Sequence, residues 1–276
     1  MSPMKLMRFA NTAAALLLTA AAPAFAGIHY KSTTHMENPQ ARGKGTNDMQ
    51  VEGWADGGKS RVEFRESGNP LMKKGSYMIT KDGGKTVYLV NPQDKTYAAW
   101  DLEGMLGGAG SMMNGIGGLL KIEISDPKVV KGLDEDGGTL LGLPTRHVRY
   151  RTSYSMTMKI MGRGNTSDVV IDQEVWVAPK LQDLALGIWL RTPRTGNEQI
   201  DKLIKAESGK VQGIPLKTVS VTTSTDKKRG QPSVTRATME VTQLDTAATV
   251  PAASFEIPAG YKETEMMPIP QGGRGE

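Results

Sequence analysis

The chain has 276 residues, 16 of them Met and none Cys, and a formal net charge of +5. Without Cys it makes no disulfide, has no thiolate nucleophile and offers no Cys-based metal site. The positive charge is weak and scattered among acidic residues, with one tight basic cluster at residues 227–229. Nucleic-acid-binding proteins show a concentrated basic patch, so nucleic acid is not an expected partner.

The first 26 residues have the layout of a secretory signal peptide. Lys5 and Arg8 form a basic start, an uncharged run spans residues 9–22, and Ala24 and Ala26 occupy the two small-residue positions before a cleavage site. The apolar run is shorter than the roughly 20 residues of a membrane-spanning helix. We therefore expect export, cleavage after Ala26, and a mature chain without a transmembrane segment.

Apolar and polar residues alternate with period two through much of the remaining chain, most clearly in residues 147–160. Such alternation is typical of a β-strand with one buried face. The buried face is predicted to hold Val148, Tyr150, Thr152, Tyr154, Met156, Met158 and Ile160. Arg149, Arg151 and Lys159 fall on the opposite, solvent-facing side.

Shorter runs of the same kind predict further strands, and two similar turns connect some of them as hairpins. These strands are expected at residues 28–36, 49–55, 59–66, 77–81, 86–91, 96–100, 121–125, 169–177, 216–223 and 234–244. Residues 56–59 and 82–85 both read Asp-Gly-Gly-Lys, which supplies the positive φ angles of a tight hairpin. The chain is therefore predicted to be mainly β, with an antiparallel meander at residues 48–100.

Two stretches interrupt this pattern. Residues 101–120 are rich in Gly and Met and carry no charge between Gly104 and Leu120, which predicts a flexible apolar flap over a cavity. Residues 181–208 have apolar residues at helical spacing and are predicted to be a helical insertion. The predicted organisation is a signal peptide at residues 1–26, one β domain at 27–263 and a flexible tail at 264–276.

Residues 53–60 match the phosphate-binding pattern Gly-x-x-x-x-Gly-Lys-Ser letter for letter. That motif needs a strand before it and a helix N-terminus after it, so that backbone N–H groups bind the phosphate. Here a strand pattern follows, and the same turn recurs at residues 82–85 without the first Gly. A hairpin is therefore favoured over a nucleotide site.

The titratable residues form no recognisable catalytic or metal-binding set. His29, His35 and His147 lack the further ligands that a zinc site needs. The carboxylates that a glycosidase would use in pairs are Glu52, Glu63, Asp172 and Glu174. They fall on polar strand faces, and no Gly-x-Ser-x-Gly nucleophile motif occurs. We therefore predict that the protein is not an enzyme and has no catalytic residue, cofactor or bound metal.

Met residues recur in the apolar parts of the chain. Those of interest are Met105, Met112, Met113, Met156, Met158, Met161 and Met239. Three roles remain open for them: ordinary core packing, the adaptable lining of an apolar pocket, or thioether ligands of copper. The uncharged segment at residues 101–120 favours a pocket, because a flexible Gly- and Met-rich flap is poor material for a core.

Five stretches, in their order along the chain, resemble a family of bacterial envelope proteins known only as a domain of unknown function. They are residues 54–63 (WADGGKSRVE), 88–97 (YLVNPQDKTY), 142–150 (GLPTRHVRY), 174–178 (EVWVA) and 255–261 (FEIPAGY). That family is similar to the outer-membrane lipoprotein carrier (LolA-like) superfamily, and the resemblance spans residues 28–263. It implies a strongly curved antiparallel sheet, an unclosed barrel with helices in its mouth as a lid. It also implies a periplasmic location, a hydrophobic cavity for acyl chains and no catalytic residues.

Strand facing and this resemblance together predict a periplasmic protein that binds a lipid, an acyl chain or another hydrophobic small molecule in the barrel cavity. The strand residues predicted to line the cavity are Phe64, Tyr150, Tyr154, Met156, Met158 and Met239. The flap is predicted to contribute Met105, Leu106, Met112, Met113 and Ile116. The alternative is a non-enzymatic envelope scaffold with a filled core and no ligand, which would bind other envelope proteins.

Overall fold

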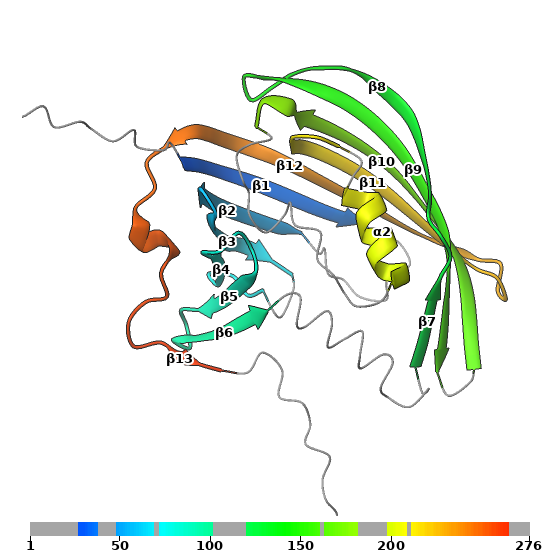
Figure 1. The fold of residues 1–276 in the computed structure, drawn as a ribbon, viewed down its shortest axis with the longest axis horizontal. Coiled ribbons are helices and arrows are strands. Elements are labelled where there is room, and N and C mark those ends of the chain that lie inside the picture. The colour runs from blue at the N-terminus through cyan, green and yellow to red at the C-terminus, as the bar shows by residue number, and fades with distance from the viewer. Residues whose placement is uncertain are drawn as a thin grey trace, which may run out of the picture.

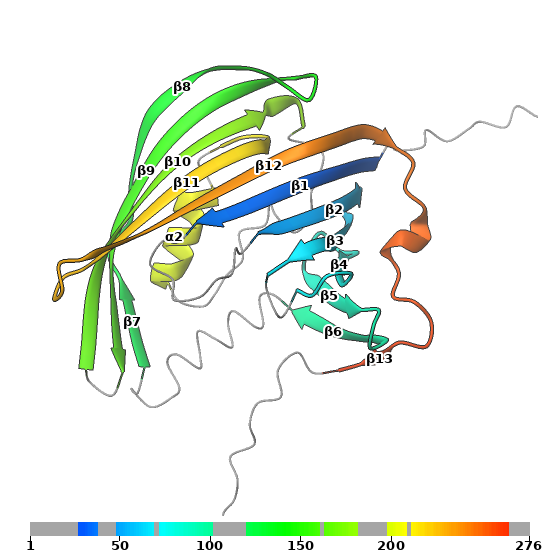
Figure 2. The same cartoon turned by 180° about the vertical axis from the view of Figure 1, so that it is seen from behind.

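The computed structural model describes residues 27–37, 48–68, 72–101, 120–160, 163–181, 198–208 and 211–264. In these ranges one continuous sheet of 13 strands is accompanied by a single α-helix and two short 3-10 helices (Figure 1). The sheet curves strongly, as both Figure 1 and the reverse view in Figure 2 show. Its concave side is termed the inner face and its convex side the outer face.

The sheet has two halves that meet in its middle. The first half contains β1 (Gly27–Glu37), β2 (Met49–Asp56), β3 (Lys59–Ser67), β4 (Tyr77–Thr80), β5 (Thr86–Asn91) and β6 (Thr96–Asp101). The second half contains β7 (Leu120–Ile124), β8 (Lys128–Leu140), β9 (Leu143–Ile160), β10 (Arg163–Ala178), β11 (Ile214–Asp226) and β12 (Pro232–Ala248). The short strand β13 (Lys262–Glu263) adds to β6 in parallel, and every other pairing is antiparallel.

The strand order is β13-β6-β5-β4-β3-β2-β1-β12-β11-β10-β9, and both β7 and β8 pair with the far edge of β9. Since β1 pairs with β12, the two halves join at that point. Within the described ranges the β13–β6 edge does not pair with the β7–β8 edge, so the curved sheet stays open. The predicted fold class, mainly β with a curved, unclosed antiparallel sheet, is confirmed.

The hairpin interpretation of residues 53–60 is also confirmed. Strands β2 and β3 pair antiparallel up to Asp56 and Lys59, and Gly57 between them has a φ of 59°. That positive angle favours Gly because its lack of a Cβ removes the steric penalty. The backbone N–H of Gly83 donates to the carbonyl oxygen of Gly58 at 2.8 Å, so the two similar turns contact each other.

Strand β8 was not expected from the sequence. Its 13 residues do not alternate, and most of their side chains are exposed. It is held to β9 by antiparallel backbone pairing with two irregularities in register. Because the strand buries little apolar surface, the usual period-two signal is missing.

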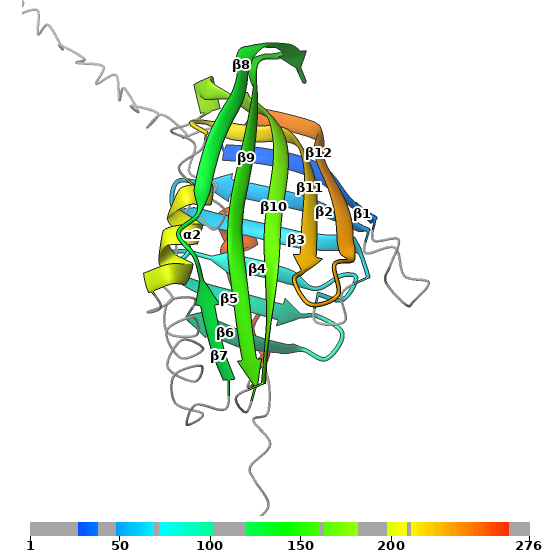
Figure 3. The same cartoon turned by 90° about the vertical axis from the view of Figure 1, so that its right-hand side faces the viewer.

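The single α-helix, α2 (Glu198–Ser208), occupies the last part of the predicted helical insertion. It lies next to β7 (Figure 3), and the side-chain oxygen Oε1 of Gln199 accepts a hydrogen bond from the backbone N–H of Ile124 at 2.8 Å. Lys202 forms an ion pair with Asp126 at 3.5 Å. The 3-10 helix η1 (Pro179–Leu181) precedes this region, and residues 182–197 lie outside the described residues.

The C-terminal segment, residues 251–263, forms a strap over the outer face of the first half (Figure 2). It contains the 3-10 helix η2 (Ala252–Phe255), and Phe255 is only 1% exposed. Ile257 and Tyr261 pack against the cluster of Tyr77, Ile79 and Val90. This strap explains why all four residues of β4 are buried, although a strand covered on one side only would have one polar face.

Candidate functional site

A cavity of about 610 Å³ lies on the inner face where the two halves of the sheet meet. It is lined by Ile28, Tyr30, Ser32, Thr34, Met49, Val51, Phe64, Met72, Met78, Gln173, Val175, Val211, Gly213, Ile214, Pro215, Leu216, Thr218, Met239, Val241 and Leu244. Most of these residues are apolar, and none of them carries a charge. The volume falls within the roughly 300–1,000 Å³ that is usual for small-molecule sites.

Strand register explains why residues so far apart in sequence share one cavity. Phe64 on β3 lies opposite Val51 on β2, which lies opposite Ser32 on β1, and β12 adds Val241 opposite Ser32. The next row across the sheet contains Met49, Thr34, Met239, Thr218 and Val175. Directly opposite residues project to the same side of a sheet, so both rows face the cavity.

The cavity is apolar and closed at one end, termed the buried end, and more open at the other end, where neutral polar residues lie beside apolar ones. On the inner face of β1 the exposed fraction of the side chain rises from 1% at Ile28 and 9% at Tyr30 to 37% at Met36. Leu216 on β11 is 1% exposed, and it belongs to an apolar cluster against which Leu244 packs. The neutral polar residues Ser32, Thr34, Gln173 and Thr218 lie toward the other end of the same strands.

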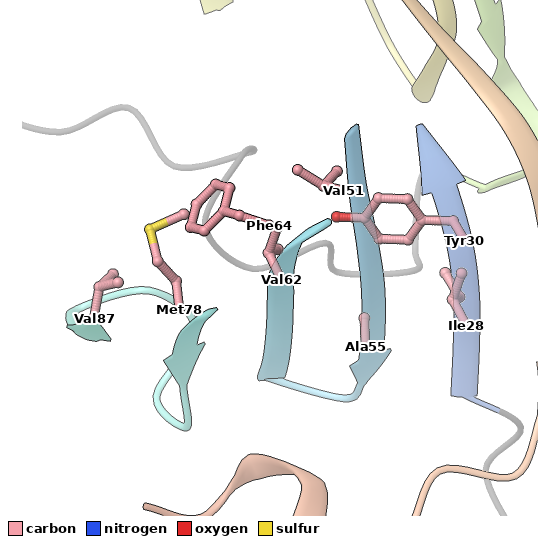
Figure 4. Close-up of a cluster of buried hydrophobic side chains, with 8 residues drawn as sticks. All are labelled: Ile28, Tyr30, Val51, Ala55, Val62, Phe64, Met78 and Val87. Atoms are coloured by element: carbon pink, nitrogen blue, oxygen red, sulfur yellow. The ribbon is translucent and has the colours of Figure 1, made fainter. Parts of the chain in front are cut away.

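Tyr30 lies across the inner face of the first half, and Gly53 makes this possible. Figure 4 shows the Tyr30 ring between Ile28 and Val51 and above β2. A Cβ placed on Gly53 would overlap the ring and the hydroxyl oxygen of Tyr30. The glycine therefore allows a large aromatic side chain to cross the sheet surface at close range.

Two of the predicted strand residues, Phe64 and Met239, line the cavity. Tyr150 is 7% exposed and packs in a neighbouring cluster with Val148, Val175 and Val177. It faces the same side of the sheet as the cavity, because Val148 lies opposite the cavity residue Val175 and alternation carries the facing on to Tyr150.

Tyr154, Met156 and Met158 continue along that inner face of β9, but they are not among the residues that line the cavity. The prediction that Met158 is buried is wrong, because it is 39% exposed, and Tyr154 and Met156 are only partly buried. Strands β10 and β11 separate β9 from Met239 on β12, a distance of about 14 Å at the usual strand spacing. The fold therefore does not gather these described Met residues into one set of copper ligands.

All five residues of the predicted flap lie outside the described residues: Met105, Leu106, Met112, Met113 and Ile116. Several residues that line the cavity were not predicted from the sequence to do so, among them Tyr30, Met49, Met72, Leu216 and Val241. Alternation marked the strands that carry most of these residues. It did not show that β1 and β12 pair, which is the contact that brings the two halves together.

Paired charges occupy the outer face in the described part of the sheet. Glu52 accepts hydrogen bonds from His29 at 2.7 Å and from Arg65 at 2.9 Å. Burial would raise the pKa of Glu52, but these hydrogen bonds and the nearby cations outweigh it and lower the pKa below its ordinary value. Similarly, the Arg151 guanidinium donates to Asp172 at 2.7 Å and lowers the pKa of that carboxyl group.

His29 and His147 each stack on a Trp of the neighbouring strand, also on the outer face. The ring centres of His147 and Trp176 are 4.1 Å apart, and those of His29 and Trp54 are 5.3 Å apart. No group of three His, Asp or Glu side chains in the described ranges is arranged to hold a metal ion. None of the helices in those ranges has the length and apolar character needed to span a bilayer.

Comparisons with protein-family models and with curated proteins gave no match. A solved structure with some similarity is that of a DUF1329 family protein from Desulfovibrio piger, a family whose name denotes a domain of unknown function. The sequence identity is 10%, the TM-score is 0.31, and the match covers 85% of this chain and 91% of the other. Similarity at this level does not assign the chain to that family.

Proposed function

We propose that this is an exported, periplasmic binding protein that holds a lipid, an acyl chain or another hydrophobic ligand in the inner-face cavity, without catalysis. The observation that carries the proposal is the uncharged, mostly apolar lining of a cavity of about 610 Å³. The predicted signal peptide supports export, and the relationship to lipoprotein carriers inferred from the five sequence stretches is part of the same proposal.

Burial alone provides the binding energy in this proposal. Each CH₂ group moved from water into an apolar environment contributes about 0.8 kcal/mol. An alkyl chain therefore needs an apolar wall and an entrance, but no catalytic or charged group. Met49, Met72, Met78 and Met239 in the lining suit ligands of irregular shape, because the Met side chain is flexible and polarizable.

Lipid extraction of protein purified from periplasm without detergent, followed by mass spectrometry, tests the proposal directly. We expect a stoichiometric hydrophobic species. The extract should be accompanied by a titration with the neutral dye Nile red, whose fluorescence rises in an apolar site. An empty protein that also fails to bind Nile red would favour the alternative of a scaffold with no ligand.

A matched pair of variants locates the site. Met239→Trp places an indole into the cavity, whereas Glu240→Trp adds the same ring at the next, exposed position on the outer face. We expect Nile red affinity to fall at least about tenfold in M239W, a loss of roughly 1.4 kcal/mol, and to be retained in E240W. Circular dichroism of both variants checks that the sheet remains folded. Equal Nile red affinities in M239W and E240W would show that the dye binds outside the cavity.

A further inference from the structure

A row of hydroxyl side chains continues from the open end of the cavity along the inner face of β11. This hydroxyl stripe consists of Thr218, Ser220, Thr222 and Ser224. Thr218 lines the cavity, and Ser220 lies opposite Gln173, which also lines it. Because side chains at alternate positions share a face, all four residues project inward. Each is partly accessible, neither buried nor fully exposed.

The neighbouring strand extends the stripe sideways. Thr222 lies opposite Thr235 on β12, and Ser224 lies opposite Ser233. The charged residues of the same strands, such as Lys217 and Arg236, fall at the alternate positions and so on the outer face. The first charged group at an inward position of β11 is Asp226, at the end of the strand, and its carboxylate accepts hydrogen bonds from the backbone N–H groups of the following turn.

The buried end, the cavity and the hydroxyl stripe thus form a continuous path along which the described lining residues carry no charge. A ligand that places a carboxylate, phosphate or ammonium group on this path would lose its hydration and find no opposite charge among the described lining residues. Such burial of an unpaired ion is costly. A neutral hydroxyl, ester or amide group, in contrast, exchanges its hydrogen bonds with water for bonds to Ser, Thr and Gln side chains at little net cost.

We propose that the ligand is an uncharged amphiphile, with its alkyl part against Ile28 and Leu216 and its neutral polar head on the hydroxyl stripe. This inference rests on the proposed function and specifies its ligand class. Monoacylglycerols, fatty alcohols and N-acyl amides have this chemistry. Free fatty acids, alkylamines and phospholipids do not.

Competition against bound Nile red distinguishes these classes. Monolaurin, laurate and dodecylamine have alkyl chains of matched length and differ in the charge of the head group at pH 8. We expect monolaurin to displace the dye at a concentration at least about tenfold lower than either charged compound, since 1.4 kcal/mol corresponds to a factor of ten. Equal competition by laurate or dodecylamine would overturn the proposal while leaving hydrophobic binding intact. If Nile red itself does not bind, the proposed function fails as well.

The double variant Thr218→Val, Ser220→Ala removes two hydroxyl groups of the stripe while changing little volume. Its monolaurin affinity should fall about fivefold, as expected for the loss of one or two hydrogen bonds, and its affinity for dodecane should stay unchanged. Thr223→Val, on the outer face of the same strand, is the control and should behave as wild type. A parallel loss of dodecane binding in the double variant would show that the hydroxyl groups support the structure and do not contact the ligand.

Discussion

Two three-stranded units of the sheet, β1–β3 and β9–β11, have closely similar outer faces. In the first unit His29 lies opposite Trp54, which lies opposite Arg61. The second unit repeats this row with His147, Trp176 and Lys217. Each Trp follows a Glu by two positions, and that Glu lies opposite a basic residue: Lys31 faces Glu52 and Arg149 faces Glu174.

The inner faces of the same two units differ. On the inner face of the first unit, the positions next to the His29–Trp54–Arg61 row are Tyr30, Gly53 and Val62, which lie opposite one another. At the corresponding positions the second unit has Val148, Val175 and Thr218. Two residues further along the third strand, the buried Phe64 of the first unit corresponds to the hydroxyl residue Ser220 of the second.

This comparison indicates that the polar surface pattern is common to both halves, whereas the residues that shape the cavity are particular to each. The first unit supplies large apolar side chains, and the second supplies the hydroxyl stripe. Their surroundings also differ, because η2 of the strap packs against β3, and Arg61 donates to the carbonyl oxygen of Ser254 at 3.4 Å.

The largest expected effect comes from removing the apolar side chain that distinguishes the inner faces. Phe64→Ala should lower the free energy of unfolding by about 3–5 kcal/mol, since the side chain is fully buried. Ser220→Ala, at the corresponding position, should change it by less than about 0.5 kcal/mol. Urea denaturation measures both. Similar losses in the two variants would mean that the inner faces are energetically equivalent.

Replacing Gly53 and Tyr30 by the Val residues of the second unit tests the packing of Tyr30 on Gly53. Gly53→Val introduces the residue found at position 175 and should cost about 1–3 kcal/mol by overpacking against the Tyr30 ring. Adding Tyr30→Val recreates the Val–Val pair of the second unit and should recover part of that loss. A double-mutant cycle in urea quantifies the coupling. Additive effects would contradict the close approach of the ring to Gly53.

We expect the basic residue opposite each Trp to contribute more to stability in β1–β3, the unit that the strap covers. Arg61 contacts the Tyr77 ring at 3.7 Å and also forms an ion pair with Glu63, whereas Lys217 lies 5.5 Å from the Trp176 ring. We expect Arg61→Ala to cost about 1–2 kcal/mol and Lys217→Ala less than about 0.5 kcal/mol. Thermal unfolding compares them, with Arg61→Lys as a test of whether charge alone suffices. A larger loss of stability in K217A than in R61A would contradict this expectation.

The smallest expected effect is a pH dependence from Glu52. Its pKa is lower in the folded protein than in the unfolded chain, so its contribution to stability is present above the unfolded pKa of about 4.3 and is lost as pH falls through the folded value. The difference in unfolding free energy between wild type and Glu52→Gln should therefore be larger at pH 7 than at pH 3. A difference that is constant over this range would show that ionisation of Glu52 does not contribute.

Several local features follow directly from residue patterns. The alternation in residues 147–160 correctly predicts that Val148, Tyr150 and Thr152 are buried while Arg149 and Arg151 are exposed. The Asp-Gly-Gly-Lys turns correctly indicate hairpins. The carboxylates Asp172 and Glu174 lie on a polar strand face as predicted, and their pairing with Arg151 and Arg149 is a further finding of the structure. Alternation failed for β8, whose side chains face solvent on both sides.

The cavity residues are harder to predict. The side of a strand on which a residue lies follows from its local sequence, whereas its place in a cavity depends on strands that are distant in sequence. Tyr154 and Met156 have the same facing as Tyr150, yet the cavity lies beside other strands. Leu216 and Val241 lie in predicted strands, but nothing in their local sequence marks them as cavity residues. They meet Ile28 and Phe64 only because the last long strand, β12, returns to pair with the first.

By itself, the sequence therefore determines most of the strands that bury one face, where many of them turn and which of their sides is apolar, because these follow from steric and hydrophobic preferences of near neighbours. Only the tertiary structure decides how far the sheet curves, which apolar positions enclose a cavity and where the hydroxyl stripe meets it. These depend on the pairing of β1 with β12, whose partner residues, such as Tyr30 and Leu244, are separated by most of the chain.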